Sequence, residues 1–230
     1  METIAENWQA LRERIARAAH KAGSDPEEIT VIAVTKTRRA AEIDAAIACG
    51  LTLVGENRVQ ETEAKKDQVS GRAQWHLIGH LQRNKARKAA ALFDAIQSVD
   101  NARLADALDR HAGDLGRALD VLVQVNTSGA EQQGGTEPEE VPALAEHIAG
   151  LEHLHFKGLM TLGAHTDDEA RIGACFGRLR RLGEELKSAA VSGVEMRYLS
   201  MGMSGDFELA ITEGANMLRL GTVIFGPRPT

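Results

Sequence analysis

The chain has 230 residues, a formal net charge of −6 and a hydrophobic content of 43%. Such a chain is long and apolar enough to bury a full-sized core, and we expect one domain over residues 1–230. Its acidic balance argues against nucleic acid as the main partner, because binding to phosphate backbones requires a concentrated positive surface. No apolar stretch is long enough to cross a bilayer. Cys49 and Cys175 lack metal-ligand spacing, so we expect a cytoplasmic protein with reduced thiols.

The first 23 residues predict an amphipathic helix. Ile4, Trp8, Leu11 and Ile15 fall at helical spacing, and Gly23 is a suitable C-terminal stop. The segment lacks the continuous apolar region of a secretory signal, and its glutamates are wrong for an organellar transit peptide. We therefore expect an extra helix ahead of the main fold.

Short apolar runs then alternate with helical patterns along the rest of the chain. The candidate strands lie in TVIAVTK, LTLVGEN, QWHLIGH, AIQSVD, DVLVQVN, HFKGLMT, RYLSMGM and NMLRLGTVI. Strict alternation of apolar strands with single helices is typical of a parallel sheet, and eight repeats predict a closed (β/α)8 TIM barrel. A doubly wound open sheet is the alternative. It would need a glycine-rich turn after an early strand, whereas the first strand here is followed by TKTRRA.

Polar residues gather at one end of these strands. Those at or just past a C-terminal strand end are Lys36, Asn57, His80, Ser98, Asn126, Thr161, Ser200 and Arg219. In a TIM barrel this end carries the functional site, although any strand becomes polar where it leaves the core. Lysine is seldom buried without a partner. Lys36 therefore either marks the point where its strand meets solvent or lies in a pocket that uses its amine.

Two late segments predict a phosphate site. SMGMSGD, residues 200–206, follows the seventh strand, and RLGT, residues 219–222, covers the exit of the eighth. Small residues leave backbone N–H groups accessible, while Ser204 and Thr222 add hydroxyl donors. These residues could instead form turns alone. We favour a phosphate cradle because the two segments occupy the loops where this fold commonly binds phosphate.

A lysine opposite a phosphate cradle indicates a Schiff base with a phosphorylated carbonyl compound. The ligand is then a sugar phosphate, as in a lysine-dependent aldolase, or pyridoxal 5′-phosphate (PLP). Arg219 favours PLP. It lies three residues before Thr222, so its guanidinium can meet the ring nitrogen of a ligand whose phosphate is bound at Thr222. An aldolase also needs a nearby acid/base group, and only Glu56 and Asp100 are acidic residues at strand ends.

Two other polar pairs receive structural interpretations. His76 and His80 are four residues apart on one strand, too distant to chelate a single ion. Asp167 and Asp168 precede a long helix, where acidic residues commonly cap the N-terminus. We predict no metal site.

Seven segments in order resemble the YggS/PROSC family of PLP-binding proteins, the PLP homeostasis proteins. They are AVTKT, GENRVQE, WHLIGHLQRNK, QVN, GLMT, SMGMSGDFELAI and RLGTVIFGPR. The resemblance implies a barrel like the N-terminal domain of alanine racemase, with PLP bound covalently to Lys36 as an aldimine. The implied cofactor-binding residues are Lys36, Asn57, His80, Met160, Ser200, Met203, Ser204, Arg219, Gly221 and Thr222.

Within that set, the resemblance assigns Ser204, Gly221 and Thr222 to the phosphate of PLP and Arg219 to the pyridine nitrogen. One departure concerns the loop at residues 126–135, where Gln133 occupies a position at which the family usually carries lysine. A role for that loop lysine is therefore not expected here.

The resemblance implies a protein of intracellular vitamin B6 homeostasis that carries or buffers PLP, with PLP-dependent apoenzymes as its implied partners, without established catalysis. The alternative is a PLP-dependent racemase, which needs a second base. The only tyrosine, Tyr198, lies mid-strand and is interpreted as barrel filling. An arginine at the pyridine nitrogen also disfavours the protonated ring that serves as the stronger electron sink. We expect a monomeric carrier.

Overall fold

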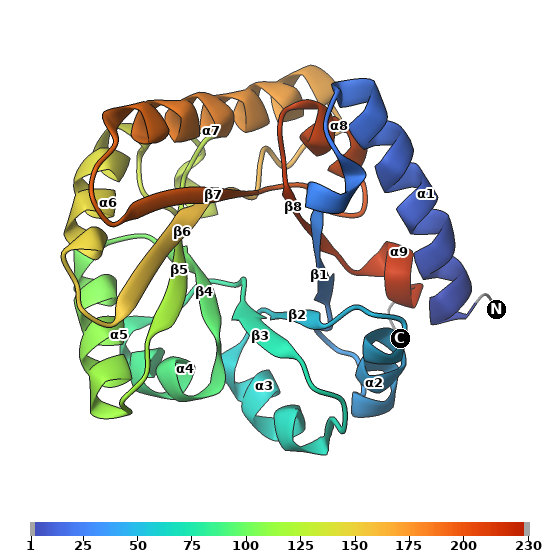
Figure 1. Cartoon of the computed structure of the whole chain (residues 1–230), viewed down its shortest axis with the longest axis horizontal. Helices are drawn as coiled ribbons and strands as arrows, with labels where there is room; N and C mark the ends of the chain where they lie inside the picture. Colours follow the sequence, from blue (N-terminus) through green and yellow to red (C-terminus); the bar gives the residue numbers. More distant parts are fainter. Residues whose placement is uncertain (1–2, 228–230) are drawn as a thin grey trace.

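The computed structural model describes residues 3–227, so the ends of the expected 1–230 domain lie outside the described residues. Eight parallel strands pair in chain order, and β8 returns to β1 to close a barrel (Figure 1). The strands are β1 Thr30–Val34, β2 Leu53–Glu56, β3 Gln74–Leu77, β4 Ala95–Val99, β5 Leu119–Gln124, β6 Leu154–Met160, β7 Val194–Ser200 and β8 Met217–Leu220. The prediction of a (β/α)8 TIM barrel is confirmed.

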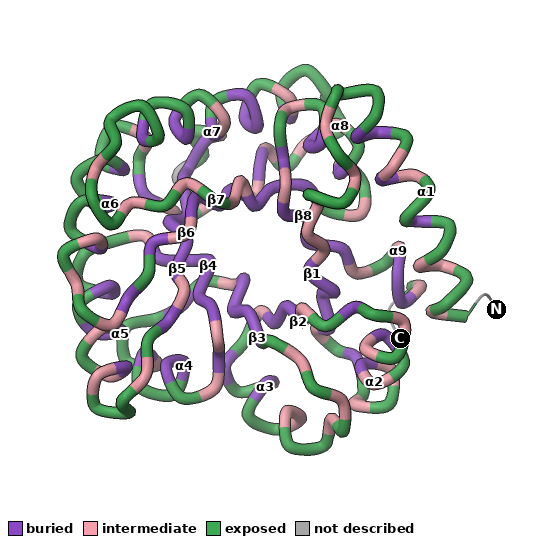
Figure 2. Tube along the Cα trace, viewed as in Figure 1, coloured by how far each residue is buried: buried purple, intermediate pink, exposed green. Residues whose placement is uncertain are grey.

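Helices surround the barrel as an outer ring (Figure 1). They are α1 Ile4–Ala22, α2 Ala40–Ala48, α3 Val59–Lys65, α4 Ala86–Leu92, α5 Ala102–Asp114, α6 Val141–Ala149, α7 Glu169–Ala189, α8 Phe207–Thr212 and α9 Thr222–Phe225. Figure 2 shows buried backbone along the strands and exposed backbone on the outer helix faces. Of the helices within residues 3–227, none combines the length and the apolar character needed to cross a membrane.

The predicted N-terminal helix forms and packs against α8 and α9. Thr3 and Glu6 make a reciprocal capping box at its start, and Gly23 ends it with a left-handed φ of 73°. Leu11 and Ile15 are buried on its inner face. The helix therefore covers the side of the barrel where the chain closes on itself.

Strand β8 is shorter than predicted. It ends at Leu220, and the following Thr-Val-Ile residues form the short helix α9 rather than more strand. The N–H of Ile224 donates to the carbonyl of Gly221 at 2.9 Å, which closes the first turn. β-Branched residues favour strands, and a short apolar run does not reveal by itself which structure it adopts. As a result, Thr222 begins a helix at the mouth of the barrel.

The interior of the barrel is filled by side chains from facing strands. Ile32, Leu122, Met160 and Met217 form a buried cluster, and Tyr198 packs against it. These residues come from β1, β5, β6, β8 and β7, so the cluster spans the barrel. The interpretation of Tyr198 as barrel filling is confirmed.

Candidate functional site

A cavity of about 650 Å³ opens at the C-terminal mouth of the barrel. Its lining comes from segments that follow β1, β2, β3, β6, β7 and β8 and from the loop after β5. The lining residues are Val34, Lys36, Asn57, Ile78, Gln132, Gln133, Leu162, Gly163, Ala164, His165, Met203, Ser204, Gly205, Arg219, Gly221 and Thr222. Residues that are far apart in the sequence therefore meet at the end of the barrel where TIM-barrel sites are built.

Most of the predicted site residues line this cavity. They are Lys36, Asn57, Met203, Ser204, Arg219, Gly221 and Thr222. Met160 and Ser200 are fully buried at the ends of β6 and β7 and are not part of the lining, although Ser200 accepts a hydrogen bond from Arg219. His80 is not brought into the lining: its side chain is 65% exposed and faces Asp100 at 3.6 Å. A role for His80 stays a prediction.

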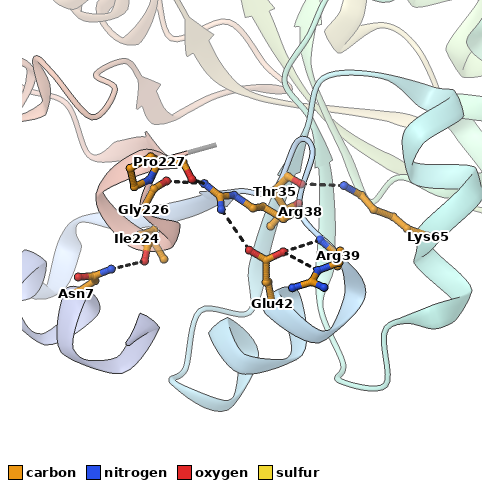
Figure 3. A network of polar contacts seen from close by, with 9 residues as sticks. All are labelled: Asn7, Thr35, Arg38, Arg39, Glu42, Lys65, Ile224, Gly226 and Pro227. Carbon is orange, nitrogen blue, oxygen red and sulfur yellow. Dashed lines mark hydrogen bonds and ion pairs between the residues drawn. The ribbon is translucent and has the colours of Figure 1, made fainter. Parts of the chain in front are cut away.

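The backbone just before Lys36 is held by a buried ion pair. Lys65 Nζ donates to the carbonyl oxygen of Thr35 at 2.8 Å (Figure 3) and lies 2.5 Å from Glu56 Oε1. The hydroxyl of Thr35 also donates to Glu56 Oε1. Burial raises the pKa of Glu56, while the bonds from Lys65 and Thr35 oppose that shift. Thr35 is thus fixed through both its carbonyl and its side chain.

The backbone just after Lys36 is held from the other side. The guanidinium of Arg38 donates to the carbonyls of Gly226 and Pro227 and pairs with Glu42 at 3.2 Å (Figure 3). It also lies over the ring of Phe225. Arg38 is only 7% exposed. The turn that carries Lys36 is therefore fastened at one end to β2 and α3 and at the other to the segment after α9.

Arg219 supplies a buried cation to the floor of the cavity. It is 3% exposed, and its Nη1 and Nη2 donate to Ser200 Oγ at 2.8 Å and to the carbonyl of Thr161 at 2.7 Å. Burial lowers the pKa of Arg219 to about 10, and Asp206 opposes that shift. The guanidinium therefore remains charged at neutral pH.

A chain of buried polar side chains leads away from Arg219 through the barrel. Ser200 Oγ donates to Gln97 Oε1 at 2.7 Å, and Gln97 Nε2 lies 3.0 Å from His76 Nδ1. Burial lowers the pKa of His76 to about 4, so the ring is neutral at pH 7. Sequence reasoning missed Gln97 and selected its neighbour Ser98, whose hydroxyl donates to the carbonyl of Gly79. Alternation along the strand does not single out Gln97, because the pairing of β4 with β5 is irregular between Ile96 and Val99.

The predicted phosphate cradle is assembled from the loops after β7 and β8. The N–H of Gly221 donates to Ser204 Oγ at 3.4 Å, which brings the two loops together. Asp206 accepts from the N–H of Met203 at 2.5 Å and fixes the first loop. A Cβ added at position 221 would lie 3.3 Å from the carbonyl oxygen of Val34, so glycine keeps this wall open.

The donor set fits a phosphorylated carbonyl ligand. Lys36 provides an amine, Arg219 provides a guanidinium, and Ser204 and Thr222 provide hydroxyls around one cavity. Asn57 Oδ1 is buried at this cavity and has no hydrogen-bond partner among the described residues. An unpaired buried oxygen is costly in a folded protein, and this one belongs to a residue that lines the cavity.

Comparisons with known proteins identify the family. A family model described as alanine racemase, N-terminal domain, matches residues 3–229. A relative from Pseudomonas aeruginosa named pyridoxal phosphate homeostasis protein is 41% identical over 229 residues, which are 99% of this chain and 97% of that protein. The chain belongs to the pyridoxal phosphate homeostasis protein family.

Solved structures agree with this assignment. The structure of PipY from Synechococcus elongatus with PLP bound matches this chain with a TM-score of 0.85 and 38% sequence identity. The match covers 97% of this chain and 100% of the PipY chain. Alanine racemase of Clostridium difficile matches with a TM-score of 0.76 at 17% identity, and 56% of that chain is covered. The racemase likeness shows the fold alone.

The loop at residues 126–135, which carries Gln133, is held by hydrogen bonds. Ser128 Oγ donates to Gln133 Oε1 at 2.5 Å, and Gln124 Nε2 donates to the carbonyl of Gly134 at 3.2 Å. Gln132 and Gln133 line the cavity and present amides rather than a cation.

The buried His76 predicts a specific loss of stability in acid. Its pKa is 6.5 in an unfolded chain and about 4 in the fold. Between these values only the unfolded state takes up the proton, so the free energy of unfolding falls as pH decreases, by on the order of 3 kcal/mol in total. We expect the free energy of unfolding, measured by urea denaturation across this pH range, to depend less on pH for His76→Gln than for the parent protein. His20→Gln, at an exposed position on α1, is the control and should follow the parent; superimposable slopes for all three would contradict the prediction.

Proposed function

We propose that this protein binds PLP covalently through Lys36 and serves in intracellular PLP homeostasis as a carrier or buffer of the cofactor. The observation that carries the proposal is the single cavity that gathers Lys36, Arg219 and the hydroxyls of Ser204 and Thr222 at the C-terminal mouth of the barrel. The names of the relatives and the PLP-bound PipY structure support the same ligand.

Each lining group has a role in the proposal. Lys36 Nζ would hold the aldehyde carbon through a carbon–nitrogen bond formed with loss of water, while Ser204, Gly221 and Thr222 would donate to the phosphate. Arg219 would lie nearest the ring nitrogen, and Asn57 would accept a hydrogen bond from the ligand. When bound, PLP supplies an electrophilic carbonyl carbon and an electron-withdrawing ring.

Two observations favour a carrier over a racemase. Arg219 remains cationic at neutral pH, and a cation at the ring nitrogen opposes the ring protonation that strengthens electron withdrawal. Tyr198, the only tyrosine of the chain, packs into the barrel interior and lines a cavity at the opposite mouth. It is therefore not placed to act as a second base beside Lys36.

Covalent binding to Lys36 can be tested directly. The protein mixed with PLP should show a visible absorbance band, and borohydride should add one phosphopyridoxyl group to the peptide that contains Lys36. Lys36→Ala should abolish this labelling because the amine is gone. Lys187→Ala removes an exposed lysine of α7 and should label like the parent. The proposal fails if the parent remains colourless and takes up no PLP.

The phosphate cradle can be tested by comparing PLP with pyridoxal, which lacks the phosphate. Thr222→Val keeps the shape of the side chain and removes its hydroxyl, so PLP affinity should fall by about tenfold, the usual scale for a hydrogen bond to a charged group. Pyridoxal affinity should hardly change. Thr212→Val on the surface of α8 is the matched control. Equal losses for both ligands would show that Thr222 does not contact phosphate.

The carrier role can be tested by transfer to an apoenzyme in the presence of a phosphatase that destroys free PLP. The loaded protein should still reactivate the apoenzyme, while an equal concentration of free PLP should not. D- and L-alanine should not be racemised above the background of free PLP. Transfer that the phosphatase abolishes would reduce the protein to a passive store. Incorporation of solvent deuterium at the Cα of alanine, if it were lost on substitution of either Lys36 or Tyr198, would instead establish that the protein is a racemase.

A further inference from the structure

A second cavity, of about 860 Å³, opens at the opposite mouth of the barrel. It is lined by residues at or near the beginnings of strands, among them Thr30 of β1, Gln74 of β3 and Ala95 of β4. In TIM barrels this face generally contributes stability rather than function. The polar character of its lining therefore needs a separate explanation.

His76 lies at the base of this second cavity and is 7% exposed. Its Nδ1 faces Gln97 Nε2 at 3.0 Å, and an amide nitrogen can only donate, so Nδ1 must accept. The proton of the neutral ring is therefore on Nε2. Within residues 3–227, Nε2 has no hydrogen-bond partner and is not sealed from the cavity. A buried ring thus presents a fixed N–H donor to the cavity.

The charges around this donor leave a positive group available. Arg117 pairs with Asp94 at 3.3 Å, and its guanidinium also donates to the carbonyls of Ala91 and Phe93. Asp120 lies 3.4 Å from His155, which balances the charge of that carboxylate only when the ring is protonated. Arg72 is exposed at the rim and makes no ion pair with any described residue.

Arg72 and His76 lie on the same stretch of chain, with Gln74 between them in the cavity wall. Both residues therefore border one cavity, and a shared ligand would have to lie in the space between their side chains.

We propose that the N-terminal mouth is a binding site for a small oxyanion, a carboxylate or a phosphate group, which accepts hydrogen bonds from His76 Nε2–H and pairs with Arg72. The site is separate from the cavity that contains Lys36 and does not depend on PLP binding. The chain from His76 through Gln97 and Ser200 ends at Arg219, so the site has a direct hydrogen-bonded connection to the cofactor side of the barrel.

Nitrogen NMR of protein labelled in its histidine rings tests the site, with His76→Gln used to assign the signal. His76 should show the neutral form protonated at Nε2, and this nitrogen should shift in a saturable manner on addition of inorganic phosphate or of acetate. The anion that binds with higher affinity identifies whether the site takes phosphate or carboxylate groups. No saturable shift with either anion up to about 10 mM, which would largely fill a millimolar site, would overturn the proposal.

A pair of arginine variants separates a specific site from a general salt effect. Arg72→Gln should weaken anion binding by about tenfold, because it removes one charge-assisted hydrogen bond. Arg103→Gln makes the same change at an exposed position on α5, outside the cavity, and should leave the titration unchanged. If both substitutions weakened anion binding equally, or if neither weakened it, Arg72 would not contact the anion.

Discussion

The buried guanidinium of Arg219 is the constraint on which the polar interior of this barrel depends. Arginine stays protonated and can only donate, so its burial requires acceptors that the barrel itself must supply. Ser200 Oγ and the carbonyl of Thr161 provide them. The hydroxyl of Ser200 then requires its own acceptor, which is Gln97, and the amide of Gln97 requires His76. One buried charge thus accounts for polar side chains along the length of the barrel.

The charge of Arg219 also makes the lining of the C-terminal cavity positive, whereas the whole molecule is negative. The chain carries a formal net charge of −6, yet the described residues that line this cavity include Lys36 and Arg219 and no aspartate or glutamate. A concave site of one sign attracts ligands of the other sign and raises their local concentration. A dianionic phosphate ligand is therefore favoured there, while the acidic exterior disfavours other polyanions such as nucleic acid.

The sequence predicted the barrel and seven of the residues that line the cavity, because strand alternation and strand ends are local signals. Lys36, Ser204 and Thr222 lie within a few residues of a strand end, so their positions at the mouth follow from the fold. Gln97 was missed because it lies inside a strand beside Ser98, and sequence alone does not reveal which of two adjacent polar residues faces inward. His80 follows a strand like the others, but the loop after β3 turns its side chain to solvent.

The turn that carries Lys36 is restrained more than a surface loop needs to be. Thr35 is bound to Glu56 and Lys65, while Arg38 is bound to the carbonyls that follow α9. Thr222 starts α9 and Phe225 ends it, so the lysine turn and the phosphate cradle are joined through one short helix. Restraint of both groups before a ligand arrives lowers the entropy cost of binding. In the proposed carrier, the same restraint would keep the amine of Lys36 and the hydroxyl of Thr222 in position both before loading and after release.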